Sequence, residues 1–355
     1  MTHLTLGWSI VVLLLSAFLQ HTLAFNTSIF QVIQPVFETL LGPTPQIEVL
    51  VKASGGQQLY HEGGAYHDPS GALWVSSDGL PNATNRRIFR VTGLGSPATV
   101  HVESINHTIP NPVGAHANVP GSPLGDVILF VAQGSLAKTP PAGVYAMNPF
   151  PPYNTSLVIG SYGDNSFNSL DDITVTPDGV IFISDPPYGY GQGNRPKPLL
   201  PNQVYSYNPF TNDLRVAADG FVRPNGLAAS PDGNTIYVAD TGALLYENVP
   251  LDTQGSRTIY AFDRVNGFLT NRRVFAMPQA SASAADGIRV DSYGNLWASV
   301  AGQGISVWDK SGTLLGDIMI DDNGGNLGLA DLGELYLLGG DTIFKVSVSK
   351  TVRHA

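Results

Sequence analysis

The 355-residue chain contains no cysteine, so no disulfide can stabilise it and no thiol can act as a nucleophile or metal ligand. Charged residues make up only 13% of the chain, which leaves little material for long exposed helices. The sequence also lacks a Gly-x-Ser-x-Gly motif, the usual setting of a serine nucleophile in one large hydrolase fold. These absences disfavour chemistry through a Ser or Cys acyl-enzyme.

Basic residues are scarce as well. The 18 Lys and Arg residues against 28 Asp and Glu give a formal net charge of −10. Nucleic-acid binding needs a basic surface, so this balance argues against nucleic acid as a partner. An acidic surface suits a protein that gathers cations, although solubility alone would produce the same charge.

The N-terminus has the pattern of a secretory signal. An apolar run covers Ser9 to Leu19, and the small residues Thr22 and Ala24 follow at cleavage positions. We therefore predict a signal peptide over residues 1–24 and a secreted, extracellular protein. A membrane anchor is the alternative, but the run is short for a bilayer span, so no membrane association is expected after cleavage. Four Asn-x-Ser/Thr sequons fit secretion as glycosylation sites: Asn26, Asn82, Asn106 and Asn154.

Turn residues are abundant, with 39 Gly and 26 Pro. The turn Pro231–Gly233 and the apolar segment Thr235–Asp240 form a unit that recurs along the chain. An aromatic residue marks each of six copies, roughly fifty residues apart: Trp74, Phe130, Phe182, Tyr237, Trp297 and Tyr336. This period predicts an all-β, six-bladed β-propeller in one domain, over residues 51–355, after a lead-in segment at 25–50. A generic all-β protein with common turns is the alternative.

Four polar side chains occupy one position of this repeat. Asn225 precedes Gly226 and lies six residues before Pro231; Asp171 has the same distance to Pro177. Asp286 and Glu62 likewise stand directly before glycine. In a propeller this position is the inner end of the innermost strand, so the four side chains should converge on the axis. Asp172, next to Asp171, must face the other way and is assigned to a backbone or turn contact.

Glu62, Asp171, Asn225 and Asp286 would offer three carboxylates and one amide oxygen. Such a hard oxygen set favours Ca²⁺, with Mg²⁺ or Mn²⁺ as alternatives, and without a cation the carboxylates would repel one another. A cation there can polarise a carbonyl or phosphoryl oxygen and activate water, while a neighbouring carboxylate takes the proton.

Candidate substrate contacts come from two stretches rich in turn residues. Asn111 and His116 lie in a Pro/Asn-rich stretch, and Tyr188 lies in a Gly/Pro/Tyr loop at the end of a predicted strand. Each is also compatible with an ordinary loop residue.

Several motifs carry a family resemblance. Pro224–Gly233 and Asp286–Asp291 resemble the gluconolactonase/senescence-marker-protein family of six-bladed propellers. Secreted fungal lactonohydrolases are similar over further segments: 148–155, 167–172, 188–190, 202–205 and 307–312. The resemblance covers about Leu59 to Val348. It implies a Ca²⁺-dependent hydrolase that opens a sugar-type lactone or pantolactone, a small-molecule substrate. By this analogy Glu62, Asp171, Asn225 and Asp286 match the metal ligands, and Asp286 is also the candidate catalytic base.

The chain departs from the family at two positions. Asp171 stands where the family usually has Asn, and this replacement keeps an oxygen ligand at that position. Val113 stands where the fungal enzymes typically have Asn. Two other functions remain open: a phosphotriesterase-like hydrolase using the same site, and a non-catalytic ligand-binding propeller with a structural cation. The identity of the lactone and the oligomeric state are not determined by the sequence.

Overall fold

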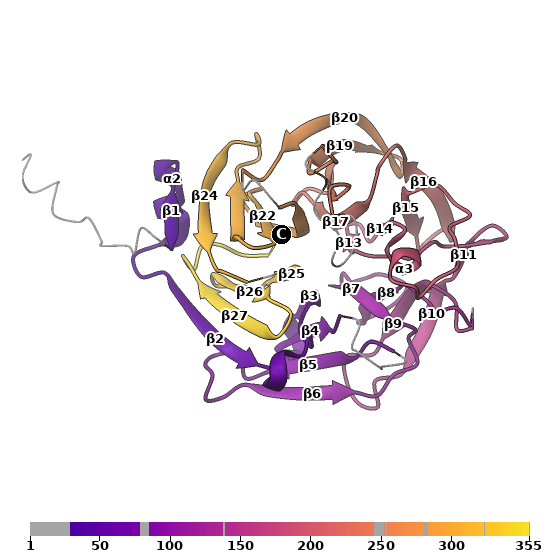
Figure 1. The fold of residues 1–355 in the computed structure, drawn as a ribbon, viewed down its shortest axis with the longest axis horizontal. Coiled ribbons are helices and arrows are strands. Elements are labelled where there is room, and N and C mark those ends of the chain that lie inside the picture. Colours follow the sequence, from indigo (N-terminus) through magenta and orange to yellow (C-terminus); the bar gives the residue numbers. More distant parts are fainter. Residues whose placement is uncertain are drawn as a thin grey trace, which may run out of the picture.

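The six aromatic markers of the repeat each lie on the strand next to the innermost strand of an antiparallel sheet, and all are buried. The computed structural model describes residues 29–78, 85–137, 139–244, 252, 254–279, 283–322 and 324–354. In Figure 1 the six sheets stand around a common axis as the blades of a propeller. The prediction of a six-bladed, all-β propeller is therefore confirmed.

Each blade runs from an innermost strand to an outer one in chain order. Blade 1 contains β3 (Glu62–His67), β4 (Ala72–Ser76), β5 (Ile88–Thr92) and β6 (His101–Ile105). Blade 2 contains β7 (Pro112–Ala117), β8 (Ile128–Ala132), β9 (Gly143–Met147) and β10 (Thr155–Ile159). Blade 3 contains β13 (Ile173–Val175), β14 (Ile181–Asp185), β15 (Gln203–Asn208) and β16 (Asp213–Ala218).

The second half of the ring repeats this order. Blade 4 contains β17 (Pro224–Ala229), β18 (Thr235–Asp240), β19 (Ile259–Val265) and β20 (Phe268–Ala276). Blade 5 contains β21 (Ala285–Val290), β22 (Leu296–Val300), β23 (Gly304–Trp308) and β24 (Leu314–Met319). Blade 6 contains β25 (Asn326–Leu329), β26 (Glu334–Leu338) and β27 (Thr342–Ser347) from the C-terminal part of the chain.

The N-terminal segment closes the ring. Strand β2 (Gln46–Lys52) pairs antiparallel with β27 and supplies the outermost strand of blade 6. Strand β1 (Phe30–Val32) pairs with β24 and adds a fifth strand to blade 5. In Figure 1 the indigo β2 lies beside the yellow β27, so chain segments from both ends share one blade.

Residues 25–50 were expected to form a lead-in segment before the propeller. Their described part instead contributes strands β1 and β2 to blades 5 and 6. The boundary expected at residue 51 falls inside β2, which begins at Gln46. An outermost strand is half exposed and shows only weak alternation, as β2 does, with Leu50 alone fully buried. This is why its hydrophobic pattern gave no strand signal.

Short elements decorate the blades: α2 (Pro35–Leu41), the 3₁₀ turns Ser54–Gly56 and Asp68–Ser70, α3 (Tyr188–Gly191), and the hairpin β11 (Ser161–Tyr162) with β12 (Asn165–Ser166). The core is divided into clusters that each join adjacent blades, such as Val131, Ile173 and Tyr205 between blades 2 and 3. Among the residues described, no helix is long and apolar enough to cross a membrane.

The innermost strands of neighbouring blades contact one another around the whole ring, in the order β3, β7, β13, β17, β21, β25 and back to β3. These six strands form the wall of the central channel (Figure 1).

Candidate functional site at one end of the channel

The repeat position predicted from the sequence coincides with a repeated irregularity of the inner strands. Where the innermost strand pairs with the second strand, the register shifts near its start in blades 1, 2, 4 and 5. Such a bulge leaves residues out of the ladder and re-aims their side chains. Asn225 and Asp286 lie inside these bulges, and Glu62 lies directly before one.

Glycines next to the polar residues let neighbouring inner strands approach closely. A Cβ atom on Gly226 would lie 2.0 Å from the backbone oxygen of Asp286, and one on Gly287 would lie 2.2 Å from Oδ1 of Asn326. Both separations are far below contact distance, so no side chain fits at either position. The Asn-Gly and Asp-Gly pairs thus bring the starts of β17, β21 and β25 together.

An aspartate at the end of the second strand holds the segment that enters the inner strand in two blades. Asp185 binds the segment that lies just before Asp171 in the chain. Asp240 binds the segment just before Asn225. Each carboxylate accepts two backbone N–H groups, at 3.0 and 2.7 Å from Asn168 and Ser169, and at 3.0 and 2.8 Å from Val222 and Arg223. Burial raises the pKa of Asp185 to about 7, against the effect of these hydrogen bonds.

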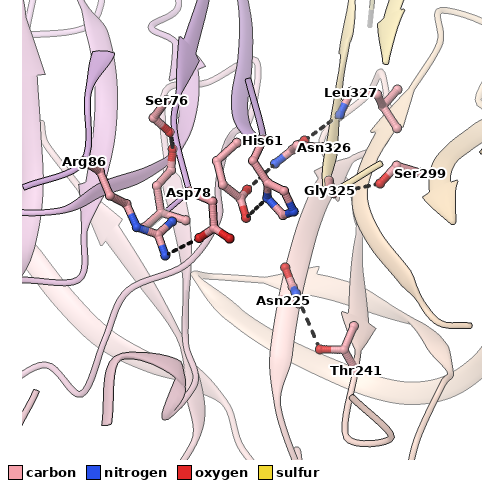
Figure 2. A network of polar contacts seen from close by, with 12 residues as sticks. His61, Ser76, Asp78, Arg86, Asn225, Thr241, Ser299, Gly325, Asn326 and Leu327 are labelled. Atoms are coloured by element: carbon pink, nitrogen blue, oxygen red, sulfur yellow. Dashed lines mark hydrogen bonds and ion pairs between the residues drawn. The ribbon is translucent and has the colours of Figure 1, made fainter. Parts of the chain in front are cut away.

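Glu62 is held by His61 and Asn326, two neighbours labelled in Figure 2. Its Oε1 lies 3.2 Å from Nδ1 of His61, and its Oε2 accepts a 3.3 Å hydrogen bond from Nδ2 of Asn326. The Oδ1 of Asn326 accepts the N–H of Leu327 at 2.9 Å, which turns the amide nitrogen toward Glu62. Although burial alone lowers the pKa of His61, the hydrogen bond and charge of Glu62, with the charges of Asp78 and Asp286, raise it to about 9.

Asn326 is a site residue that the sequence reasoning missed. It is the first residue of β25, so it occupies the start of the innermost strand in blade 6. The repeat there has short strands and a weak turn motif, and Asn326 is preceded by glycines rather than followed directly by one. Its position ahead of the sixth aromatic marker was the available signal.

Asn225 is positioned from blade 4. Its Nδ2 donates to Oγ1 of Thr241 at 3.5 Å (Figure 2), and Thr241 in turn shares a short hydrogen bond with the hydroxyl of Tyr188. Burial and the charges of Asp171 and Asp286 raise the pKa of Tyr188, so its hydroxyl keeps its proton. Tyr188 is thus linked through Thr241 to Asn225, and its role as a substrate contact stays a prediction.

The acidic side chains form one electrostatic group. Burial comes first in raising the pKa of Asp171 well above its usual value, followed by the charges of Glu62, Asp286 and Asp172. Burial and the charge of Glu62 also raise the pKa of Asp286, while His61 and a hydrogen bond from Asn225 oppose the shift. Within the described residues, however, no three Asp, Glu, His or Cys side chains lie close enough together to hold a metal ion. The charges of these carboxylates influence one another, but the carboxylates do not form a closed ligand shell.

Asp172 makes a backbone contact, as expected. Its Oδ2 accepts the N–H of Leu227 at 3.0 Å and lies 3.7 Å from the guanidinium of Arg289. Arg289 also donates to the backbone oxygens of Ile288 at 2.8 Å and Gly63 at 2.9 Å. This buried ion pair crosses the channel and links blades 1, 3 and 5 directly beneath the candidate site.

The other two predicted substrate contacts, Asn111 and His116, do not both lie at the channel end that holds the acidic side chains. Asn111 is buried, and its side chain is bonded to the backbone at Arg86 and Gly134, which makes it a support of the loop before β7. His116 lies toward the far end of β7, five residue steps along the strand from Asn111, a distance of about 17 Å. The structure therefore separates His116 from Glu62. Val113 packs in the core between blades 2 and 3.

Of the predicted glycosylation sites, Asn106 and Asn154 are exposed. Asn26 and Asn82 lie outside the described residues, as does the predicted signal peptide.

A six-bladed propeller with acidic side chains gathered at one end of its channel defines the structural class. Residues 60–338 match the SMP-30/gluconolactonase/LRE-like region, so the chain belongs to that family. It is 30% identical over 213 residues to the lactonohydrolase oryL of Aspergillus oryzae, covering 56% of this chain and 48% of that protein. It is 33% identical over 169 residues to a gluconolactonase of Zymomonas mobilis, covering 45% of this chain and 44% of that protein. The chain thus aligns with about half the length of these relatives.

Solved structures agree with the fold. A gluconolactonase from Xanthomonas campestris superposes with a TM-score of 0.71 at 25% identity, covering 90% of this chain and 95% of that chain. A calcium-binding regucalcin from Agrobacterium tumefaciens gives a TM-score of 0.61 at 16% identity, covering 86% and 96%, and supports the fold alone.

Proposed function

We propose that the protein is a secreted lactone hydrolase that depends on a divalent cation, Ca²⁺ by preference with Mg²⁺ or Mn²⁺ as substitutes, and acts on a small sugar-type or pantoyl lactone. Its relatives named lactonohydrolase and gluconolactonase support the reaction class. The observation that supports the proposal is that Glu62, Asn225 and Asp286 lie in or next to the bulges at the starts of innermost strands, with Asp171 just before β13.

The donor chemistry at this place fits a hard cation. The ligands would be the carboxylates of Glu62, Asp171 and Asp286 and the amide oxygen of Asn225, with no sulfur donor. Burying several carboxylates together is costly without a counter-charge, which the raised pKa values of Asp171 and Asp286 express. A bound cation would supply that charge and would polarise the lactone carbonyl.

The chain's own residues would carry the remaining steps. Asp286 is partly buried, stands within the acidic group and is our choice of general base for the attacking water. Tyr188 keeps its proton and could donate a hydrogen bond to the substrate. Asn326 and His61 orient Glu62 from either side. Secretion would follow from the N-terminal apolar run, and exposed Asn106 and Asn154 are suited to carry glycans.

The test is a pH-stat assay over a panel of γ- and δ-lactones, run with calcium and again with a chelator. We expect Asp286→Asn to lose turnover by about a hundredfold or more while the melting temperature in chelator stays at or above the wild-type value, because a repelling charge is removed. Full turnover in chelator, or by Asp286→Asn, would end the proposal.

An organophosphate triester assayed beside the lactones separates the two hydrolase classes, since the same site could polarise a phosphoryl oxygen. Faster turnover of the triester would favour the hypothesis of a phosphotriesterase-like hydrolase. Calcium binding without turnover of either substrate class would favour a ligand-binding propeller with a structural cation.

A further inference from the structure

A second cavity lies at the opposite end of the channel from Glu62. Its volume is about 740 Å³, within the range of small-molecule binding sites. It is lined by residues at the ends of the innermost strands of blades 1 to 5, whereas the acidic group lies at their starts. Its walls include Ala117, Val119, Val175, Ala228, Ala229 and Val290.

Arg289 separates the two ends. Its side chain lines the cavity, yet its guanidinium is directed to Gly63 and Asp172, under the acidic group. Because Arg289 is already engaged with these partners, its guanidinium is not available to pair with an anionic ligand in the cavity. The carboxylates of Asp68 and Asp126 also line it, and Asp126 accepts from His67 at 2.7 Å.

One polar group in the wall has a defined hydrogen-bonding role. Nδ1 of His116 lies 2.6 Å from the backbone oxygen of Ala117, and a carbonyl can only accept, so Nδ1 carries the proton. In a neutral ring Nε2 is then an acceptor, and no donor to it is found in the described part of the chain. Burial, then the charges of His354 and Arg289, lowers the pKa of His116 to about 3, which keeps the ring neutral.

We propose that this cavity is a second ligand site, separate from the acidic end, for an uncharged and mostly apolar molecule that donates a hydrogen bond to Nε2 of His116, as a phenol or other hydroxylated ring system would. The apolar walls bind the ring system by removing its surface from water. The imidazole acceptor selects a hydroxyl or N–H over an ether. The lining carboxylates of Asp68 and Asp126 select against an acid.

The proposed preference for an uncharged hydrogen-bond donor can be tested with three naphthalene derivatives: 2-naphthol, 2-methoxynaphthalene and 2-naphthoate. Each is titrated into the full-length protein and followed by ligand-observed NMR and calorimetry. We expect saturable binding of 2-naphthol at one site. Losing the donor in 2-methoxynaphthalene should weaken binding roughly five- to tenfold, the value of one neutral hydrogen bond. The naphthoate should bind more weakly than the naphthol. No saturable naphthol binding, or tighter binding of the acid, would overturn the proposal.

Two variants locate the probe. His116→Leu should reduce 2-naphthol affinity to that of 2-methoxynaphthalene and leave the ether unaffected, whereas His101→Leu, the same change at an exposed position on β6, should alter neither. Ala229→Phe should abolish binding by filling the cavity. Binding that survives both cavity variants lies elsewhere and refutes the site. If Ala229→Phe does not fold, the His116→Leu comparison decides alone. The assay uses no lactone and no calcium, so it is independent of the proposed hydrolase activity.

Discussion

Replacing Arg289 with Met should destabilise the propeller severely, although Arg289 is neither a ligand nor a core residue. Arg289 is 5% exposed and is 3.7 Å from Oδ2 of Asp172, which is 1% exposed. Met fills similar space but leaves the Asp172 carboxylate buried without its cation, and it removes two hydrogen bonds to backbone oxygens. Breaking one side of a buried pair costs about 3–5 kcal/mol of unfolding free energy.

The second half of this prediction concerns the pair rather than the single residue. Asp172→Asn in the Arg289→Met background removes the unpaired charge, while the Asn oxygen can still accept the N–H of Leu227. The double variant should therefore recover at least about 1–2 kcal/mol relative to Arg289→Met.

Urea unfolding in excess chelator, followed by far-UV circular dichroism and tryptophan fluorescence, measures these differences without any contribution from bound metal. Arg273→Met is the matched control. Its pair with Asp263 is shorter, at 2.8 Å, but both side chains are over 40% exposed, so the change should have little effect. An Arg289→Met variant as stable as the control, or a double variant no more stable than Arg289→Met, would refute the reasoning.

Two further predictions test the channel wall. Gly226→Ala would place a Cβ atom 2.0 Å from the Asp286 oxygen, so we expect a loss of about 1–3 kcal/mol or more in urea unfolding; wild-type stability would show that β17 and β21 can separate freely. His116 is neutral when folded, with its pKa lowered to about 3, whereas the unfolded chain takes up the proton below about pH 6.5. Stability should therefore fall as pH drops from 6.5, by up to about 2 kcal/mol at pH 5, and His116→Gln should flatten this dependence. An unchanged pH profile in the variant would show that other groups cause it.

The fold could be predicted because its signal repeats. Turn residues recur about every fifty positions, and the aromatic markers Trp74 to Tyr336 all lie on second strands. The outermost strand β2 was missed because ring closure pairs it with β27, almost three hundred residues away in the chain, and its half-exposed pattern is weak. Periodicity reports local burial and carries no information on such a long-range pairing.

The candidate site was predictable to the extent that the repeat is regular. Asn225 and Asp286 precede glycines because the bulge and the close approach to the next blade both require that order. Asn326 escaped because blade 6 replaces this pattern with Gly324-Gly325-Asn326. His116 was placed at the wrong end of the channel because the Pro/Asn-rich sequence was interpreted as loop around a short strand, with Asn111 and His116 both near the channel mouth. In the structure β7 runs through that sequence and carries His116 away from Asn111.

Calcium titration of the metal-free protein by calorimetry tests the central claim most directly, that Glu62, Asp171, Asn225 and Asp286 hold one cation between them. We predict saturable binding of a single Ca²⁺ per chain, and at least about tenfold weaker affinity for Glu62→Gln, since ligand charge sets calcium affinity. Absence of binding, or an affinity that Glu62→Gln leaves unchanged, would contradict the account.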